Sequence, residues 1–267
     1  MKAGMMARRE YEVVMTGTPP VGFLIGGVQK GGTTALFEYL RRHAELQMAD
    51  CKEVHFFDRD ADIDWENPDY NIYHASFEEG NGRLRGEATP IYIYWPDSIT
   101  RIYNYNPDMK MIFLFRDPVE RAYSHWAMET RRRYDDRPFS WAIREGRTRV
   151  DDPIIRGHHR VYSYVERGFY ANQLERVYNV FPERQVLNIS SSDLSNFSDQ
   201  VLRRVCDFLE ISHFPENQKA LRANVGSETT LLAPLSDADR LYLRSLYAAD
   251  QLRFTELTGL RLVGEGK

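Results

Sequence analysis

Three short runs rich in apolar residues divide the chain, and each has the length of a buried β-strand. They cover residues 21–28, 109–115 and 185–189. Strands that are apolar on both faces are typical of parallel sheets with helices on both sides. A further strand-like segment starts at Arg85 and is interrupted by Pro90, which cannot donate to a sheet ladder.

Between these runs, apolar positions recur with the spacing of α-helices. Ser236 followed by Asp239 predicts the start of a long C-terminal helix. Short helices are expected toward the end of the segment 60–82 and over residues 97–104. The clearest stripes are Leu36, Tyr39 and Leu40; Val119, Ala122, Tyr123, Trp126 and Thr130; and the apolar positions of residues 170–181 and 199–210. Strands that alternate with helices predict an α/β fold, a P-loop-like doubly wound parallel sheet flanked by helices in a single domain.

Residues 21–36 join a strand, a glycine turn and the start of a helix. The turn and helix start read Gln29, Lys30, Gly31, Gly32, Thr33 and Thr34. Free backbone N–H groups and the positive end of a helix dipole favour an anion at such a point. In nucleotide hydrolases and kinases the lysine follows the last glycine, whereas Lys30 precedes both glycines. Taken alone, the turn is also compatible with a plain Gly-Gly connection and a surface lysine.

A carboxylate and an imidazole lie two residues apart at Glu53 and His55. If residues 53–57 are extended, Glu53, His55 and Phe57 point to one side. Such a pair can do general acid/base work. A solvated strand end fits these residues as well.

The second apolar run, residues 109–115, is followed by Arg116 and then by a helix start. Asp117 is expected to cap that helix, with Pro118 in its first turn and Glu120 at the capping-box position. Ser124 lies roughly 120° around the helix from its apolar stripe. Ligands of open α/β sheets bind at the carboxyl ends of strands, so Arg116 and Ser124 could hold one anion from two sides.

Composition narrows the class of protein. The chain has 267 residues with 42% hydrophobic and 28% charged residues, and its net charge of −4 does not imply a nucleic-acid partner. No stretch has the length and hydropathy of a membrane span or a signal peptide. Cys51 and Cys206 are too few for a disulfide scaffold or a zinc set and fit a reducing cytoplasm. We therefore expect a cytoplasmic protein that binds no membrane, with residues 1–20 as an N-terminal extension.

Four motifs, which follow one another along the chain, resemble those of a known family. They are Gln29-Lys-Gly-Gly-Thr-Thr34, Lys52-Glu-Val-His-Phe-Phe57, Phe115-Arg-Asp-Pro-Val-Glu-Arg-Ala-Tyr-Ser124 and Gly168-Phe-Tyr-Ala171. Together they resemble sulfotransferases that use 3′-phosphoadenosine 5′-phosphosulfate (PAPS), most closely the heparan sulfate N- and 3-O-sulfotransferase branch. The resemblance runs from about residue 21 to residue 262 and implies a sulfotransferase domain over residues 21–267.

The resemblance implies transfer of a sulfuryl group from PAPS to a hydroxyl or amine. Residues 29–34 would bind the 5′-phosphosulfate, with Lys30 at the bridging oxygen. Arg116 and Ser124 would bind the 3′-phosphate, and Tyr170 would lie near the nucleotide. Glu53 would be the general base, with His55 as its helper or alternative. PAPS needs no bridging magnesium, so no metal is expected.

The sequence also departs from the heparan sulfate branch. Family members often carry a lysine in Glu-Lys-Thr-Pro, whereas this chain reads Glu87-Ala88-Thr89-Pro90. A cysteine pair, a C-terminal glycine-rich nucleotide loop and a Golgi anchor have no clear counterpart, although residues 222–227 could replace the loop. These differences favour a soluble bacterial-type enzyme. They leave open the acceptor, a small molecule or a glycan, and the oligomeric state.

Two other functions fit parts of the sequence. A P-loop nucleotide or small-molecule kinase would bind ATP with magnesium. A non-catalytic nucleotide- or anionic-glycan-binding module would have no activity to lose in Glu53→Gln or Lys30→Ala.

Overall fold

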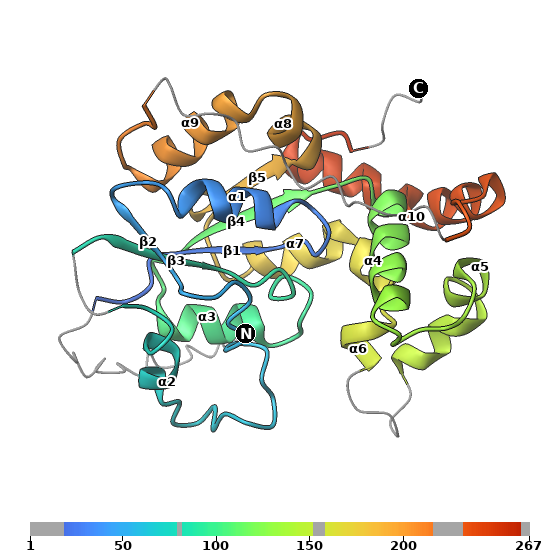
Figure 1. The fold of residues 1–267 in the computed structure, drawn as a ribbon, viewed down its shortest axis with the longest axis horizontal. Helices are drawn as coiled ribbons and strands as arrows, with labels where there is room; N and C mark the ends of the chain where they lie inside the picture. The colour runs from blue at the N-terminus through green and yellow to red at the C-terminus, as the bar shows by residue number, and fades with distance from the viewer. Residues whose placement is uncertain (1–18, 79–81, 152–157, 216–231, 263–267) are drawn as a thin grey trace, which may run out of the picture.

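A five-stranded parallel sheet forms the centre of the molecule (Figure 1). The computed structural model describes residues 19–78, 82–151, 158–215 and 232–262. Within them the strand order is β2-β3-β1-β4-β5, with bounds Phe23–Gly27 for β1, Leu46–Met48 for β2, Leu84–Ala88 for β3, Lys110–Phe115 for β4 and Val186–Ser190 for β5. β1 is the central strand, with β3 and β2 on one side of it and β4 and β5 on the other, so the predicted doubly wound α/β sheet is confirmed.

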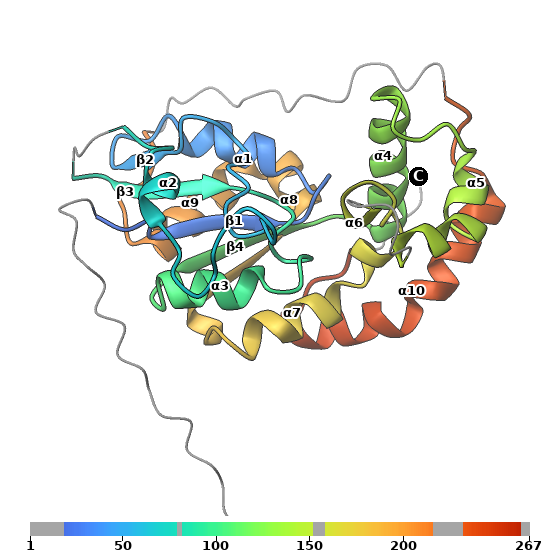
Figure 2. The same cartoon turned by 90° about the horizontal axis from the view of Figure 1, so that it is seen from below.

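Helices cover both faces of this sheet (Figures 1 and 2). On one face, Phe23 and Ile25 pack with Leu36 of α1 and with α9; on the other face, Leu24 packs with residues of α3 and α7. The covering helices are α1 (Thr33–Leu40), α8 (Ser191–Asn196) and α9 (Ser198–Leu209) on the first face, and α2 (Tyr70–His74), α3 (Ser98–Tyr105) and α7 (Tyr170–Tyr178) on the second. The short strand β2 was not predicted, because three residues carry too little pattern.

A third apolar cluster lies beyond the carboxyl ends of β1 and β4, to the right of the sheet in Figure 1. It is built mainly from α4 (Pro118–Arg131), α5 (Phe139–Ala142) and the long helix α10 (Asp237–Thr258). Three short helical segments lie between α5 and α7 along the chain: η1 (Glu145–Val150), α6 (His158–Val161) and η2 (Glu166–Gly168). A fourth, η3 (Glu183–Gln185), precedes β5. None of the helices in the described ranges is both long and apolar enough to cross a bilayer.

The predicted helix starts are confirmed where polar side chains cap them. Asp117 accepts hydrogen bonds from the backbone of Val119 (2.8 Å) and Glu120 (3.3 Å), and Ser236 accepts one from Asp239 (3.1 Å). The Glu120 side chain pairs with Arg240 instead of closing a capping box.

The sequence predicts one apolar inward face for α4, and the structure differs from this prediction. Tyr123 and Thr130 are only half-buried. A polar stripe of Arg121, His125 and Glu129 is buried beside the apolar one, at a spacing of one helical turn. Apolar periodicity alone could not identify this second buried face.

Candidate active site

The loop between β1 and α1 has the backbone geometry of an anion cradle. Lys30 (φ 69°) and Gly32 (φ 96°) adopt the left-handed conformation. A Cβ on Gly31 would lie 2.2 Å from the Leu114 carbonyl oxygen, so only glycine fits there. Gly32 precedes α1 without a side-chain cap, which leaves N–H donors of the first turn for a ligand. Thr34 at this end is exposed, whereas Thr33 is buried.

Lys30 lies among other positive charges. Its side chain is half-buried, and its Nζ contacts the Met128 sulfur at 3.8 Å. Burial lowers the pKa of Lys30, and the nearby charges of Arg131, Arg116, Arg132 and Lys52 lower it further. A group of like charges at one point of the surface favours an anionic ligand, because the ligand would relieve their repulsion.

Arg116 and Tyr170 are linked directly. Arg116 follows β4, and β4 pairs in parallel with β1, so Arg116 and the cradle lie at the same edge of the sheet. The Tyr170 hydroxyl donates to the Arg116 carbonyl oxygen at 2.9 Å. The Tyr170 ring is fully buried against Phe115 and Phe254. This contact supports the backbone of Arg116. That Tyr170 lies near the nucleotide stays a prediction.

Ser124 lies on α4, two turns after its start, and is half-buried as its angular position predicts. Arg116 is half-buried too. That the two side chains share one phosphate stays a prediction. Residues 222–227 lie outside the described residues.

Glu53 and His55 lie in a turn, and the prediction of an extended segment is wrong. Both residues are left-handed, with φ of 67° and 55°. The turn is held on the end of β3: Glu53 N donates to the Ala88 carbonyl oxygen at 2.9 Å, and His55 N donates to Thr89 Oγ1 at 3.4 Å. As a result Phe57 is buried in the core and does not share a face with the acid/base pair.

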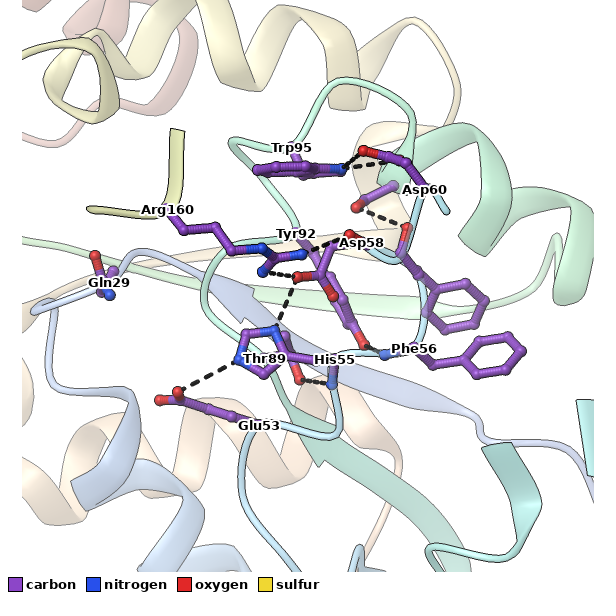
Figure 3. Close-up of polar contacts among 12 residues, drawn as sticks. Gln29, Glu53, His55, Phe56, Asp58, Asp60, Thr89, Tyr92, Trp95 and Arg160 are labelled. Carbon is purple, nitrogen blue, oxygen red and sulfur yellow. Dashed lines mark hydrogen bonds and ion pairs between the residues drawn. The ribbon is translucent and has the colours of Figure 1, made fainter. Parts of the chain in front are cut away.

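The turn nevertheless brings Glu53 and His55 together, and it adds Asp58 and Arg160 (Figure 3). His55 Nδ1 lies 2.8 Å from Asp58 Oδ2, and His55 Nε2 lies 3.7 Å from Glu53 Oε2. Arg160 pairs with the buried Asp58 carboxylate and donates to the Asp58 carbonyl oxygen at 2.7 Å. Sequence reasoning missed Asp58 and Arg160, because a contact across 102 positions leaves no local pattern.

These contacts determine which of Glu53, His55 and Asp58 are charged. The contact with His55 lowers the pKa of Glu53 to about 2, against the effect of burial. Burial alone would lower the pKa of His55, but its contacts with Asp58 and Glu53 outweigh burial and raise the pKa to about 9. At neutral pH the group therefore holds an imidazolium between two carboxylates.

No group of three or more His, Cys, Asp or Glu side chains in the described part of the chain is arranged to hold a metal ion.

Comparisons with known proteins show the family and the fold of this chain. The family model described as "Sulfotransferase domain" matches residues 21–229, so the chain belongs to the sulfotransferase domain family. A sulfotransferase structure from Alicyclobacillus acidocaldarius superposes with a TM-score of 0.75 at 26% identity and covers 91% of this chain and 97% of its own. The sulfotransferase domain from the curacin biosynthetic pathway, at 15% identity and a TM-score of 0.50, shares the fold.

Curated relatives are similar over a shorter region. Human heparan sulfate glucosamine 3-O-sulfotransferase 3B1 is 33% identical over 190 residues, which are 70% of this chain and 45% of the relative. Mouse heparan sulfate glucosamine 3-O-sulfotransferase 6 is 34% identical over 190 residues, 70% of this chain and 51% of the relative. The chain thus spans about half the length of the curated relatives it matches.

Proposed function

We propose that this protein transfers a sulfuryl group from PAPS to an acceptor hydroxyl or amine. The observation that carries the proposal is the placement of Lys30 in an uncapped glycine loop, with Arg116, Arg131, Arg132 and Lys52 near enough to lower its pKa. PAPS offers this site two anionic groups, a 5′-phosphosulfate and a 3′-phosphate. We assign the first to residues 29–34 and the second to Arg116 and Ser124.

In the proposed reaction the acceptor oxygen or nitrogen bonds to sulfur while the bond from sulfur to the bridging phosphate oxygen breaks. The products are the sulfated acceptor and adenosine 3′,5′-bisphosphate (PAP). Negative charge grows on the leaving oxygen, so Lys30 acts mainly in the transition state. As in phosphoryl transfer, positioning and charge stabilisation supply most of the rate enhancement.

Glu53 is the proposed base that takes the acceptor proton. Its low pKa makes it ionised at neutral pH but a weak base in the empty site. Burial already acts to raise the pKa of Glu53, and an acceptor that covers the carboxylate would strengthen this effect. His55 is the alternative base, and it would first have to lose the proton that Asp58 and Glu53 stabilise.

A glycan hydroxyl is the acceptor class we propose to test first, because the curated relatives are named for glucosamine 3-O-sulfation of heparan sulfate. Ala88 stands in this chain where the heparan sulfate branch often carries lysine. We therefore infer an acceptor that differs from heparan sulfate in charge or size.

The test follows product formation from two donors. Wild-type protein and Lys30→Ala would be incubated with PAPS, or with ATP and magnesium, in the presence of a mixture of glycan acceptors. We expect PAP from PAPS at a rate about 100-fold lower in Lys30→Ala. ADP from ATP, with PAPS left intact, would support the kinase alternative and contradict the proposal.

A further inference from the structure

Arg167 is a buried cation behind the proposed donor loop. It comes from η2 and is only 3% exposed. Its Nη1 donates to Gln29 Oε1 at 2.5 Å, its Nε to Ser163 Oγ at 2.8 Å and its Nη2 to the Arg160 carbonyl oxygen at 3.1 Å. Burial lowers the pKa of Arg167 to about 10, so the guanidinium still carries its charge at neutral pH.

These contacts place Arg167 between the two halves of the site. Gln29 belongs to the loop after β1, whereas Arg160 belongs to α6 and pairs with Asp58. Asp58 in turn contacts His55, which lies beside Glu53 (Figure 3). One guanidinium fork therefore connects the loop that carries Lys30 with the segment that holds the proposed base.

The contact also fixes the orientation of the Gln29 amide. An arginine side chain has donors and no acceptor, so it can face only the amide oxygen of Gln29. The Nε2 group of Gln29 consequently points away from Arg167, and within the described part of the chain it donates to no protein acceptor. Gln29 is half-buried and directly precedes Lys30, so this NH₂ group is available beside the lysine.

We propose that Arg167 is a positioning residue that holds Gln29 with its amide NH₂ turned toward the transferred sulfuryl group. The inference rests on the proposed function. A sulfuryl group carries oxygen acceptors and negative charge, and an oriented amide donor needs no reorganisation when that charge shifts. PAP lacks the sulfuryl group, so it would not use this donor.

The difference between PAPS and PAP provides the test. Affinities for both nucleotides would be measured by calorimetry, without acceptor, on wild type, Gln29→Ala, Arg167→Lys and the double variant. Lysine keeps the charge of Arg167 and loses its planar fork. We expect each single variant to lower PAPS affinity about tenfold relative to PAP affinity, and the double variant to lose no more than either single variant.

A matched control is available in another buried contact of the same kind. Arg85 Nε donates to Gln47 Oε1 at 3.0 Å, at the pairing of β3 with β2. Gln47→Ala should lower stability and leave the ratio of PAPS to PAP affinity unchanged. If Arg167 had only a structural role, Arg167→Lys would weaken PAP and PAPS equally, and its effect would add to that of Gln29→Ala.

Gln29→Glu keeps the test decisive if Arg167→Lys does not fold. Glutamate retains an acceptor for Arg167 and removes both amide N–H donors, so we expect the same selective loss of PAPS affinity. An unchanged affinity ratio in Gln29→Ala and Gln29→Glu would overturn the inference. Failure of the wild type to bind either nucleotide would instead overturn the proposed function.

Discussion

Glu53 and His55 are the two possible general bases, and they differ in the pH range over which each is deprotonated. The pKa of Glu53 is lowered to about 2 and that of His55 is raised to about 9. A Glu53 base is thus in its reactive form over the whole neutral range. A His55 base is in its reactive form only when the pH exceeds the pKa that its contacts have raised.

We therefore expect kcat/KM for sulfuryl transfer to be nearly constant between about pH 5 and pH 8, since Glu53 stays ionised there. The measurement is a pH–rate profile with saturating PAPS and the first acceptor identified. A rate that rises tenfold per pH unit up to about pH 9 would assign the base to His55 instead.

Glu87 is a further titratable group, and it is buried beneath the turn that contains Glu53 and His55. It accepts hydrogen bonds from Thr89 Oγ1 (2.6 Å) and the Tyr73 hydroxyl (3.2 Å). Burial raises its pKa to about 7. Thr89 Oγ1 also accepts from the backbone of His55, so this buried carboxyl group supports the conformation of the turn.

Glu87 should make stability depend on pH. Because its folded pKa is above its unfolded value, the stability it contributes is complete below about pH 4.5 and is lost as pH rises through about 7. Glu87→Gln does not titrate. The free energy of unfolding of the wild type, relative to this variant, should fall by up to ~3 kcal/mol between pH 4.5 and pH 8.

Urea unfolding at the two pH values measures this difference. A difference that stays constant between the two pH values would show that burial does not control the ionisation of Glu87.

The loop from β1 to α1 depends on glycine at a point of contact with β4. A Cβ at Gly31 would meet the backbone oxygens of Leu114 (2.2 Å) and Val28 (2.9 Å), which cannot move without distorting the sheet. We expect Gly31→Ala to lower the free energy of unfolding by about 3 kcal/mol and PAP affinity by more than about tenfold. Chemical denaturation and calorimetry measure the two effects.

Gly259→Ala is the matched control. Gly259 ends α10 with φ 70° and has open space around it. Alanine there should cost about 1 kcal/mol of stability through backbone strain and leave PAP affinity unchanged. Equal losses of PAP affinity in both variants would contradict a specific role for the loop.

Local sequence predicted the elements that local interactions control. The cap of α4 at Asp117 and the strand–glycine–helix order around Lys30 follow from neighbouring residues. The turn at Glu53 and His55 could not be predicted, because its left-handed residues are not glycine and are held by Ala88 and Thr89 of another segment.

The contacts that complete the site depend on the whole fold. Arg160 meets Asp58 across 102 positions and Arg167 meets Gln29 across 138. Neither pair leaves a spacing that sequence analysis could detect. The parallel sheet brings these segments together, since β1, β3 and β4 all end at the edge where the loop, the Glu53 turn and Arg116 lie.

The similarity to the Alicyclobacillus acidocaldarius sulfotransferase structure covers 91% of this chain. In such a fold the first βα loop and the start of α4 approach one ligand from two neighbouring strands. The central claim is therefore that Lys30 and Arg116 together bind a nucleotide with phosphates at both the 3′ and 5′ positions.

Calorimetry with PAP, compared with ATP plus magnesium, tests this claim most directly. On wild-type protein we predict that PAP binds without metal and about tenfold more tightly than ATP with magnesium, and that Arg116→Ala weakens PAP binding by about tenfold or more. Equal or tighter binding of ATP with magnesium, unaffected by Arg116→Ala, would contradict it.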